Sequence, residues 1–217
     1  MIENYISQIK SIKNEHSAFD YKTSVWSKLN QELKKEVKDF ENKSISRSQV
    51  LKAYKDYFNT NGNIIRPFLL TMIWGFSDNG YGTYRTNKYL TNPENHKLIK
   101  TAFEAVNNEE IEKAFKALKK IEGLGISYIS KILYFAGRAK GIKNYPLIYD
   151  IRVARSLLLL STPKEVVELV EVYPSSKFKD YNKFNEMIHG WAKKYNLKAE
   201  CIEIFLFDQK FELVESI

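Results

Sequence analysis

Apolar residues recur along most of the chain at intervals of three or four positions, which is the spacing of one face of an α-helix. The segment 64–75 is almost entirely apolar and is predicted to be a central helix. Alternation typical of β-strands is limited to short stretches in the first twenty residues and at 211–216. The pattern predicts an all-α fold. Its expected helices are 24–43, 46–58, 64–75, 95–106, 108–120, 178–195 and 198–211, with others after Gly125, Asp150 and Thr162.

A glycine-containing turn separates two of these predicted helices. It has the sequence IEGLG at residues 121–125. Glycine tolerates the positive φ angles of tight turns and lets another backbone approach closely. The helix after Gly125 begins with N–H groups that have no partner within the helix, and its dipole is positive there. The turn is therefore either a phosphate-binding hairpin or an ordinary helix–turn–helix corner with a glycine cap.

Two ionisable residues follow the turn on consecutive helices, 150 − 131 = 19 positions apart. Lys131 lies in an apolar stretch and is expected to be buried. A lysine amine attacks carbon only when it is neutral, and burial favours the neutral form. Asp150 opens the next helix, where the dipole favours an ionised carboxylate. It could stabilise positive charge on a sugar, or simply cap its helix.

This region resembles the helix-hairpin-helix motif of DNA glycosylases. Residues 121–125 are similar to the family pattern hydrophobic-Pro-Gly-hydrophobic-Gly, with Glu122 in place of proline. The sequence YDIRVAR at 149–155, preceded by Pro146, resembles the loop and helix start that carry the family's aspartate, which falls on Asp150. The resemblance is to the 8-oxoguanine DNA glycosylase branch and bacterial proteins of that fold. It implies a single, two-lobed helical glycosylase domain over residues 1–217, with its motif at 121–155.

One position departs from the family pattern. The family's lysine usually lies two residues after the second glycine, where this chain has Ser127. Lys131 lies one helical turn further on, on the same face. Either Lys131 is the displaced nucleophile, forming a Schiff base at C1′ that permits strand cleavage, or the enzyme is monofunctional and Lys131 only neutralises charge.

The positive charge of the chain supports a DNA partner. The net charge is +8, and the window 113–155 holds ten basic and two acidic residues, so it accounts for all of it. A concentrated basic region is typical of nucleic-acid binding, although solvated lysine faces are also common. The residues expected to contact DNA are Gly123, Gly125, Ser127, Lys119, Lys120, Lys140, Arg152 and Arg155.

A second candidate region is the predicted loop 76–88, FSDNGYGTYRTNK. Its Tyr81, Tyr84 and Arg85 offer rings and donors for a flipped base. The alternative is a surface loop whose tyrosines cover the core. Phe207 is a further pocket candidate that could equally be a core residue.

Several classes are excluded by what the sequence lacks. Cys201 is the single cysteine, so no disulfide framework and no cysteine-ligated zinc or iron–sulfur cluster can form. The three histidines have no ligand spacing, and no metal or cofactor is expected. The N-terminus is charged, and the longest apolar run, 156–162, is too short to span a membrane. These features indicate a cytoplasmic protein, and a monomer is expected.

The sequence therefore predicts a DNA glycosylase that flips out and excises a modified base from duplex DNA. Some bacterial proteins of this fold are implicated in antiphage defence, and the departure at the usual lysine position fits such a specialised member, so the first candidate substrate is a hypermodified phage base such as glucosylated hydroxymethylcytosine. An 8-oxoguanine repair glycosylase with AP lyase activity is the alternative. A non-catalytic helix-hairpin-helix DNA-binding protein is a second alternative, although a carboxylate facing DNA would repel phosphate.

Overall fold

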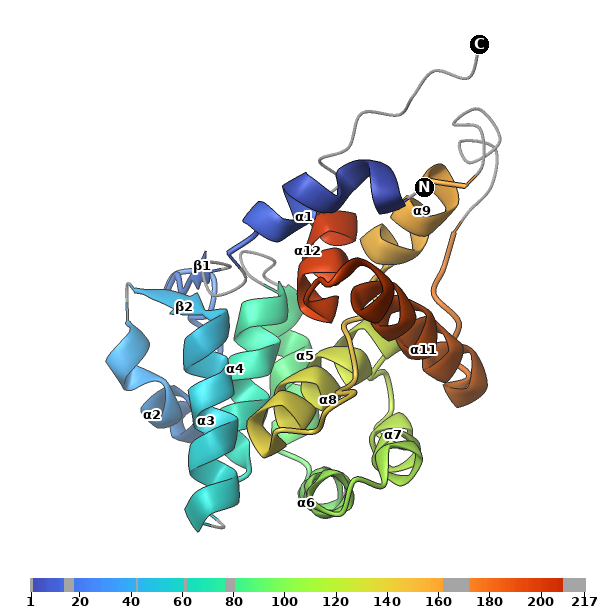
Figure 1. Cartoon of the computed structure of the whole chain (residues 1–217). Helices are drawn as coiled ribbons and strands as arrows, with labels where there is room; N and C mark the ends of the chain where they lie inside the picture. The colour runs from blue at the N-terminus through green and yellow to red at the C-terminus, as the bar shows by residue number, and fades with distance from the viewer. Residues whose placement is uncertain are drawn as a thin grey trace. The chain divides into compact units, whose positions relative to one another are not determined.

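The computed structural model describes residues 2–13, 18–41, 43–60, 62–76, 81–161 and 172–208 (Figure 1). The chain divides into two compact units. The central unit is Glu15–Pro146, and the terminal unit combines Met1–Asn14 with Leu147–Ile217.

The central unit is built around one apolar helix, α4 (Ile65–Phe76), in which nine of twelve side chains are buried. Helices α3 and α8 pack against α4 and against each other (Figure 1). The predicted central helix is thus confirmed. The unit contains α2 (Gln31–Glu36), η3 (Lys38–Phe40), α3 (Arg47–Thr60), α4, α5 (Tyr81–Leu90), α6 (Pro93–Asn107), α7 (Ile111–Lys119) and α8 (Ile126–Lys140).

A small antiparallel sheet is the exception to the helical pattern. Strand β1 (Ala18–Asp20) pairs with β2 (Ser44–Ser46), with Phe19 opposite Ile45. The first strand lies in the region where the sequence allowed one, whereas β2 was not predicted. Since the other described elements are helices, the all-α fold class is confirmed.

The expected helix over residues 24–43 is wrong. The chain forms turns at 23–28, and α2 then begins after Asn30 and ends at Glu36. The Asn30 side chain accepts a hydrogen bond from the Glu32 N–H at 2.9 Å, and the Asn30 N–H donates to Asn87. The apolar residues of the predicted stripe, such as Trp26, Leu33 and Val37, are nevertheless buried. The helical spacing therefore marks which side chains are buried, although the segment folds into turns and short helices.

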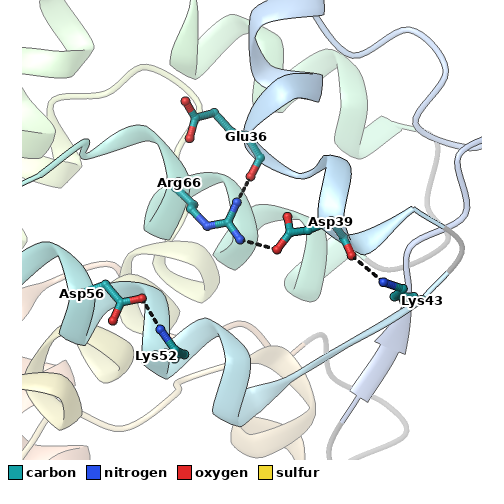
Figure 2. Close-up of polar contacts among 6 residues, drawn as sticks. All are labelled: Glu36, Asp39, Lys43, Lys52, Asp56 and Arg66. Carbon is teal, nitrogen blue, oxygen red and sulfur yellow. Dashed lines mark hydrogen bonds and ion pairs between the residues drawn. The ribbon is translucent and has the colours of Figure 1, made fainter.

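An arginine at the start of α4 holds this irregular segment (Figure 2). Arg66 donates to the backbone carbonyl of Glu36 and forms an ion pair with Asp39 at 2.7 Å. Lys43 donates to the Asp39 carbonyl at 3.1 Å. The other ion pair drawn, between two residues of α3, is exposed and contributes little to stability. Tertiary hydrogen bonds therefore override helical periodicity here.

The terminal unit is organised around α12 (Ala199–Asp208), which is buried over eight of its ten residues. It packs against α1 (Ile6–Ser11), α9 (Ile151–Leu159) and α11 (Phe178–Tyr195), and η1 (Ile2–Tyr5) precedes α1. Cys201 is buried in α12. The expected helix after Thr162 and the possible strand at 211–216 lie outside the described residues.

Candidate active site and DNA-binding hairpin

The turn between α7 and α8 is a tightly fixed hairpin. Gly123 has a φ of +82°, the left-handed region that favours glycine. Ile121 and Leu124 are buried, and the Leu124 N–H donates to the Ile121 carbonyl at 3.1 Å. The hydroxyl of Tyr89, on α5, donates to the Gly123 carbonyl at 2.7 Å. The chain therefore has a helix-hairpin-helix, held from outside by α5.

Gly125 differs from Gly123 because neither its backbone nor its packing requires glycine. It is the N-cap of α8, with an ordinary extended conformation of φ −80° and ψ 168°. A Cβ added to Gly125 would have no described atom within 4 Å. The open space lies before the first N–H groups of α8, where an oxyanion is favoured. A ligand approaching from outside the protein would account for the glycine.

The hairpin also carries a carboxylate where the family pattern has proline. Glu122 is exposed and forms an ion pair with Lys88 of α5 at 3.1 Å. Exposed pairs of this kind contribute little to stability. The lysine nevertheless offsets a charge that would repel a phosphate at the hairpin.

Lys131 is buried, with an exposed fraction of 5%, and its amine is held by the preceding turn of α8. Its Nζ donates to the Ser127 Oγ at 2.7 Å and lies 5.3 Å from the centre of the Tyr128 ring. Helical side chains lean toward the N-terminus of their helix, so a long side chain reaches the residue one turn earlier. The amine of Lys131 thus lies at the Ser127 side chain, the position of the family's usual lysine.

The end of α4 closes the space around this lysine. A Cβ on Gly75 would lie 2.9 Å from the Tyr128 ring and 3.2 Å from the Lys131 side chain, so a larger residue cannot fit without rearrangement. Phe76 stacks on Tyr128 with ring centres 4.3 Å apart. The sequence did not indicate that Gly75 and Tyr128 lie around Lys131, because the contact between them joins distant segments, and it placed Phe76 only at the start of the predicted loop 76–88.

Asp150 lies in the terminal unit as the N-cap of α9. Its carboxylate accepts a hydrogen bond from the Arg152 N–H at 3.2 Å, and its side chain is half-buried. The capping role expected from the sequence is therefore present.

Helix α11 holds the segment before Asp150. The Leu147 N–H donates to the Asn185 side chain at 2.6 Å, and the Tyr181 hydroxyl donates to the Leu147 carbonyl at 2.8 Å. Burial raises the pKa of Tyr181, so its hydroxyl keeps the proton that it donates. Tyr149 stacks on Phe184 with ring centres 4.5 Å apart. These positioning contacts had no signal in the sequence.

The other terminal-unit candidates lie on or beside α9. Arg152 and Arg155 are exposed. The Arg152 guanidinium lies 5.0 Å from the centre of the Phe207 ring, which is partly exposed, whereas Phe205 is buried. Phe207 is therefore the more accessible of the two phenylalanines.

The basic residues of the motif divide into two groups. Lys113 and Lys116 on α7 form exposed ion pairs with preceding glutamates at 2.9 and 2.7 Å. These glutamates lie just outside the window counted above, so the positive charge is less concentrated than the count suggests. Lys119 and Lys120 are exposed beside the hairpin, and Lys140 is exposed at the far end of α8.

The predicted loop at residues 76–88 is wrong from Tyr81 onward, because this part forms helix α5. Tyr81 and Tyr84 are 55% and 62% exposed on its outer face, and Arg85 is half-buried beside them. Residues 77–80 lie outside the described residues. The sequence predicted a loop because this segment is polar, contains glycine and lacks an apolar stripe.

The described residues contain no group of three or more His, Cys, Asp or Glu side chains arranged to hold a metal ion. None of the described helices combines the length and apolar composition needed to cross a membrane.

The all-α fold with its helix-hairpin-helix is that of the DNA glycosylase class. The family model described as "Putative 8-oxoguanine DNA glycosylase OGG-like protein" matches residues 13–207. The chain therefore belongs to the OGG-like family of DNA glycosylases. No curated protein and no solved structure matches the chain significantly.

Proposed function

We propose that the protein is a DNA glycosylase that flips a modified base out of duplex DNA and cleaves its N-glycosidic bond. The observation that carries the proposal is the buried amine of Lys131, held at Ser127 in the helix of the DNA-binding hairpin. A buried lysine in this motif supports a catalytic role, because a protein that only binds DNA does not need a buried amine.

The hairpin is proposed to bind the DNA backbone. A phosphate enters the space at Gly125 and accepts hydrogen bonds from the first N–H groups of α8. The exposed side chains proposed to bind flanking phosphates are Lys119, Lys120, Lys140, Arg152 and Arg155. Because this attraction is electrostatic, affinity should fall steeply with salt.

Lys131 and Asp150 are proposed to carry the chemistry. Cleavage of the bond between C1′ and the base develops positive charge on the sugar, and the Asp150 carboxylate stabilises that charge. The Lys131 amine forms a bond to C1′ through its nitrogen lone pair as the base leaves with the electron pair of the broken bond, and the proton that the nitrogen loses goes to the departing base. Cleavage of the C1′–O4′ bond of the sugar ring, with a proton taken up by O4′, then gives the Schiff base. Ser127 accepts a hydrogen bond from the ammonium form and can donate one to the neutral amine.

The proposed substrate is a modified base, with a hypermodified phage cytosine as the first candidate. The serine at the family's usual lysine position supports a specialised member. The family description supports 8-oxoguanine as the second candidate.

Base release is the direct test of this function. The protein is incubated with duplexes that carry 8-oxoguanine or glucosylated hydroxymethylcytosine, and with phage genomic DNAs, and free bases are detected by mass spectrometry. We expect release of one class of modified base and none from unmodified duplex. Salt-sensitive DNA binding without release of any base would instead support the non-catalytic DNA-binding alternative.

The two hairpin glycines provide a matched test of phosphate binding. Gly123→Ala should lower the free energy of unfolding by about 1–2 kcal/mol, because alanine resists a positive φ. Gly125→Thr should leave stability nearly unchanged, since threonine and glycine are comparable N-caps. It should nevertheless weaken duplex binding, because a lost charge-assisted hydrogen bond costs about 1.5–3 kcal/mol, or about 10–150-fold. Denaturant unfolding and fluorescence anisotropy measure the two effects. Unchanged affinity of the Gly125 variant would place the phosphate elsewhere.

A further inference from the structure

The outer side of α11 carries a line of exposed lysines. This helix has 18 residues and is the longest of the described helices. One side of it is buried and contacts α12. The other side is exposed, and its residues follow one another at intervals of three and four positions: Lys179, Lys183, Met187, Gly190 and Lys193. These five residues form the α11 lysine face.

The positive charge of this region is concealed in the charge of the whole chain. Residues 177–198 hold six lysines, two acidic residues and no arginine, a formal net charge of +4. Acidic residues elsewhere cancel it, so that the chain outside residues 113–155 sums to zero. Two of those acidic residues, Glu200 and Glu203, are buried in α12, whereas the lysines are exposed. The surface is therefore more basic than the sequence total indicates.

The two acidic residues of α11 bond to neutral groups rather than to these lysines. Asp180 accepts a hydrogen bond from the Ser175 hydroxyl at 2.7 Å, and Glu186 accepts one from the Asn182 amide at 2.7 Å. On α6 and α7, by contrast, lysines pair with glutamates one turn earlier. Within the described part of the chain, the three lysines of the face form no ion pair. Their charges are available to an external anion.

Gly190 lies at the centre of the face, where neither the backbone nor the described neighbours require glycine. It is not among the glycines with a positive φ, and a Cβ added to it would have no described atom within 4 Å. Glycine is less favourable inside a helix than every residue except proline. Its lack of a side chain lets another molecule approach the helix backbone closely. A partner that covers the outer side of α11 would account for this glycine.

The composition of the face indicates phosphate rather than protein as its partner. Protein interfaces are enriched in arginine and aromatic residues and depleted in lysine. The α11 lysine face has three lysines, no arginine and no aromatic ring. Lysine binds phosphate as a point charge, which suits contacts that are independent of sequence. From Lys179 to Lys193 the face extends about 21 Å, the length of about six nucleotides of one DNA strand.

We propose that the α11 lysine face is a second DNA-binding surface, which holds the phosphate backbone of duplex DNA whether or not a modified base is present. Its lysines replace counterions along one strand, and Gly190 lets the backbone approach the helix between them. Contacts of this kind keep a protein on unmodified DNA while it slides along the duplex. The proposal rests on the proposed function, since it takes duplex DNA as the ligand.

The first test removes the three charges in the full chain by Lys179→Gln, Lys183→Gln and Lys193→Gln. Lysine and glutamine are comparable in helices, so the variant should unfold at close to the wild-type temperature. Fluorescence anisotropy measures its affinity for an unmodified duplex between about 50 and 200 mM salt. The slope of log affinity against log salt should become shallower by about 0.9 for each lysine that contacts a phosphate, or by about 2.7 in total. The affinity lost over this range of salt should then be about 40-fold smaller than in the wild type.

A matched control removes the same number of exposed charges from the central unit. Its changes are Lys52→Gln, Lys97→Gln and Lys100→Gln, at lysines that pair with carboxylates of their own helices. The salt slope of this variant should be close to that of the wild type. Equal changes of slope in the two variants would show that only the total charge of the protein matters, and would overturn the proposal.

The centre of the face is tested by Gly190→Glu and Gly190→Gln. Both new residues are better helix formers than glycine, so both variants should unfold at a higher temperature than the wild type. The two side chains have nearly the same shape and differ in charge. Gly190→Glu should therefore bind duplex more weakly than Gly190→Gln, because its carboxylate repels phosphate. Equal affinities of these two variants would place the DNA away from α11.

The wild-type protein provides a direct readout of the contact. Lysines are acetylated with and without an unmodified duplex, and the modified positions are read by mass spectrometry. We expect the duplex to protect Lys179, Lys183 and Lys193 and to leave Lys97 reactive. A duplex that leaves the three lysines reactive would overturn the proposal, and their protection by polyglutamate alone would assign the face to an acidic protein instead. None of these measurements depends on base release, so a protein that excises no base leaves the expected results unchanged.

Discussion

Asp150→Asn should slow base release by about 10²–10⁴-fold, while DNA binding stays the same or becomes tighter. Asparagine has the same shape as aspartate and caps helices about equally well, so its side-chain oxygen can still accept the Arg152 N–H bond. The change removes only the negative charge that would stabilise a positive sugar. Loss of a carboxylate near DNA also removes a repulsion with phosphate.

The single-turnover rate of base release measures the effect on catalysis, and fluorescence anisotropy with the modified duplex measures the effect on DNA binding. Asp180→Asn is the matched control, since Asp180 also lies in the first turn of a helix of the terminal unit and binds Ser175. That variant should release base at the wild-type rate. Thermal unfolding of the Asp150 variant should be close to that of the wild type. Full activity of the variant would show that Asp150 is only a cap.

Lys131 should form a covalent link to DNA during turnover. Borohydride reduces a Schiff base to a stable amine, so the reagent should trap an enzyme–DNA adduct that maps to Lys131. Lys131→Met should abolish both the adduct and base release, because methionine fills similar space without a nucleophile. Lys97→Met, at an exposed lysine of α6, is the control and should retain both.

The position of the amine allows a second, more specific test. Because Nζ of Lys131 contacts the Ser127 Oγ, exchanging the two residues keeps a lysine in the same region of α8. The swap Ser127→Lys with Lys131→Ser should therefore recover part of the adduct that Lys131→Met loses. If the enzyme is monofunctional, no variant forms an adduct, and the product is an abasic strand that breaks only on heating in alkali. An adduct on a different lysine would refute Lys131 while leaving the glycosylase function intact.

Part of the fold could be predicted because some elements depend on their own sequence alone. The apolar run of α4 leaves no exposed face, so burial in the core was the only stable outcome. The hairpin was predictable because Gly123 adopts a backbone angle that only glycine favours. The buried state of Lys131 and the cap at Asp150 followed from their immediate neighbours in the sequence. The relation between Lys131 and Asp150 stays a prediction.

Helix α5 shows where local patterns fail. Its sequence, YGTYRTNKYL at residues 81–90, mixes polar residues with a glycine and has no apolar stripe of helical spacing. The structure stabilises this helix through Thr83 and Asn87, whose partners lie 58 and 59 residues away in the chain. The mistaken helix at residues 24–43 is the converse case, because distant partners of Asn30 and Arg66 hold a segment with helical periodicity in short turns.

The sequence by itself determined the helical class, the hairpin, and the residue types available for chemistry, since each depends on contacts within a few positions of the chain. Only the tertiary structure decided what surrounds those residues. Tyr128 meets Gly75 across 53 positions, Gly123 meets Tyr89 across 34, and Asn185 meets Leu147 across 38. Such contacts depend on how distant helices pack, because packing, unlike backbone propensity, is a property of segments that meet only in the folded chain.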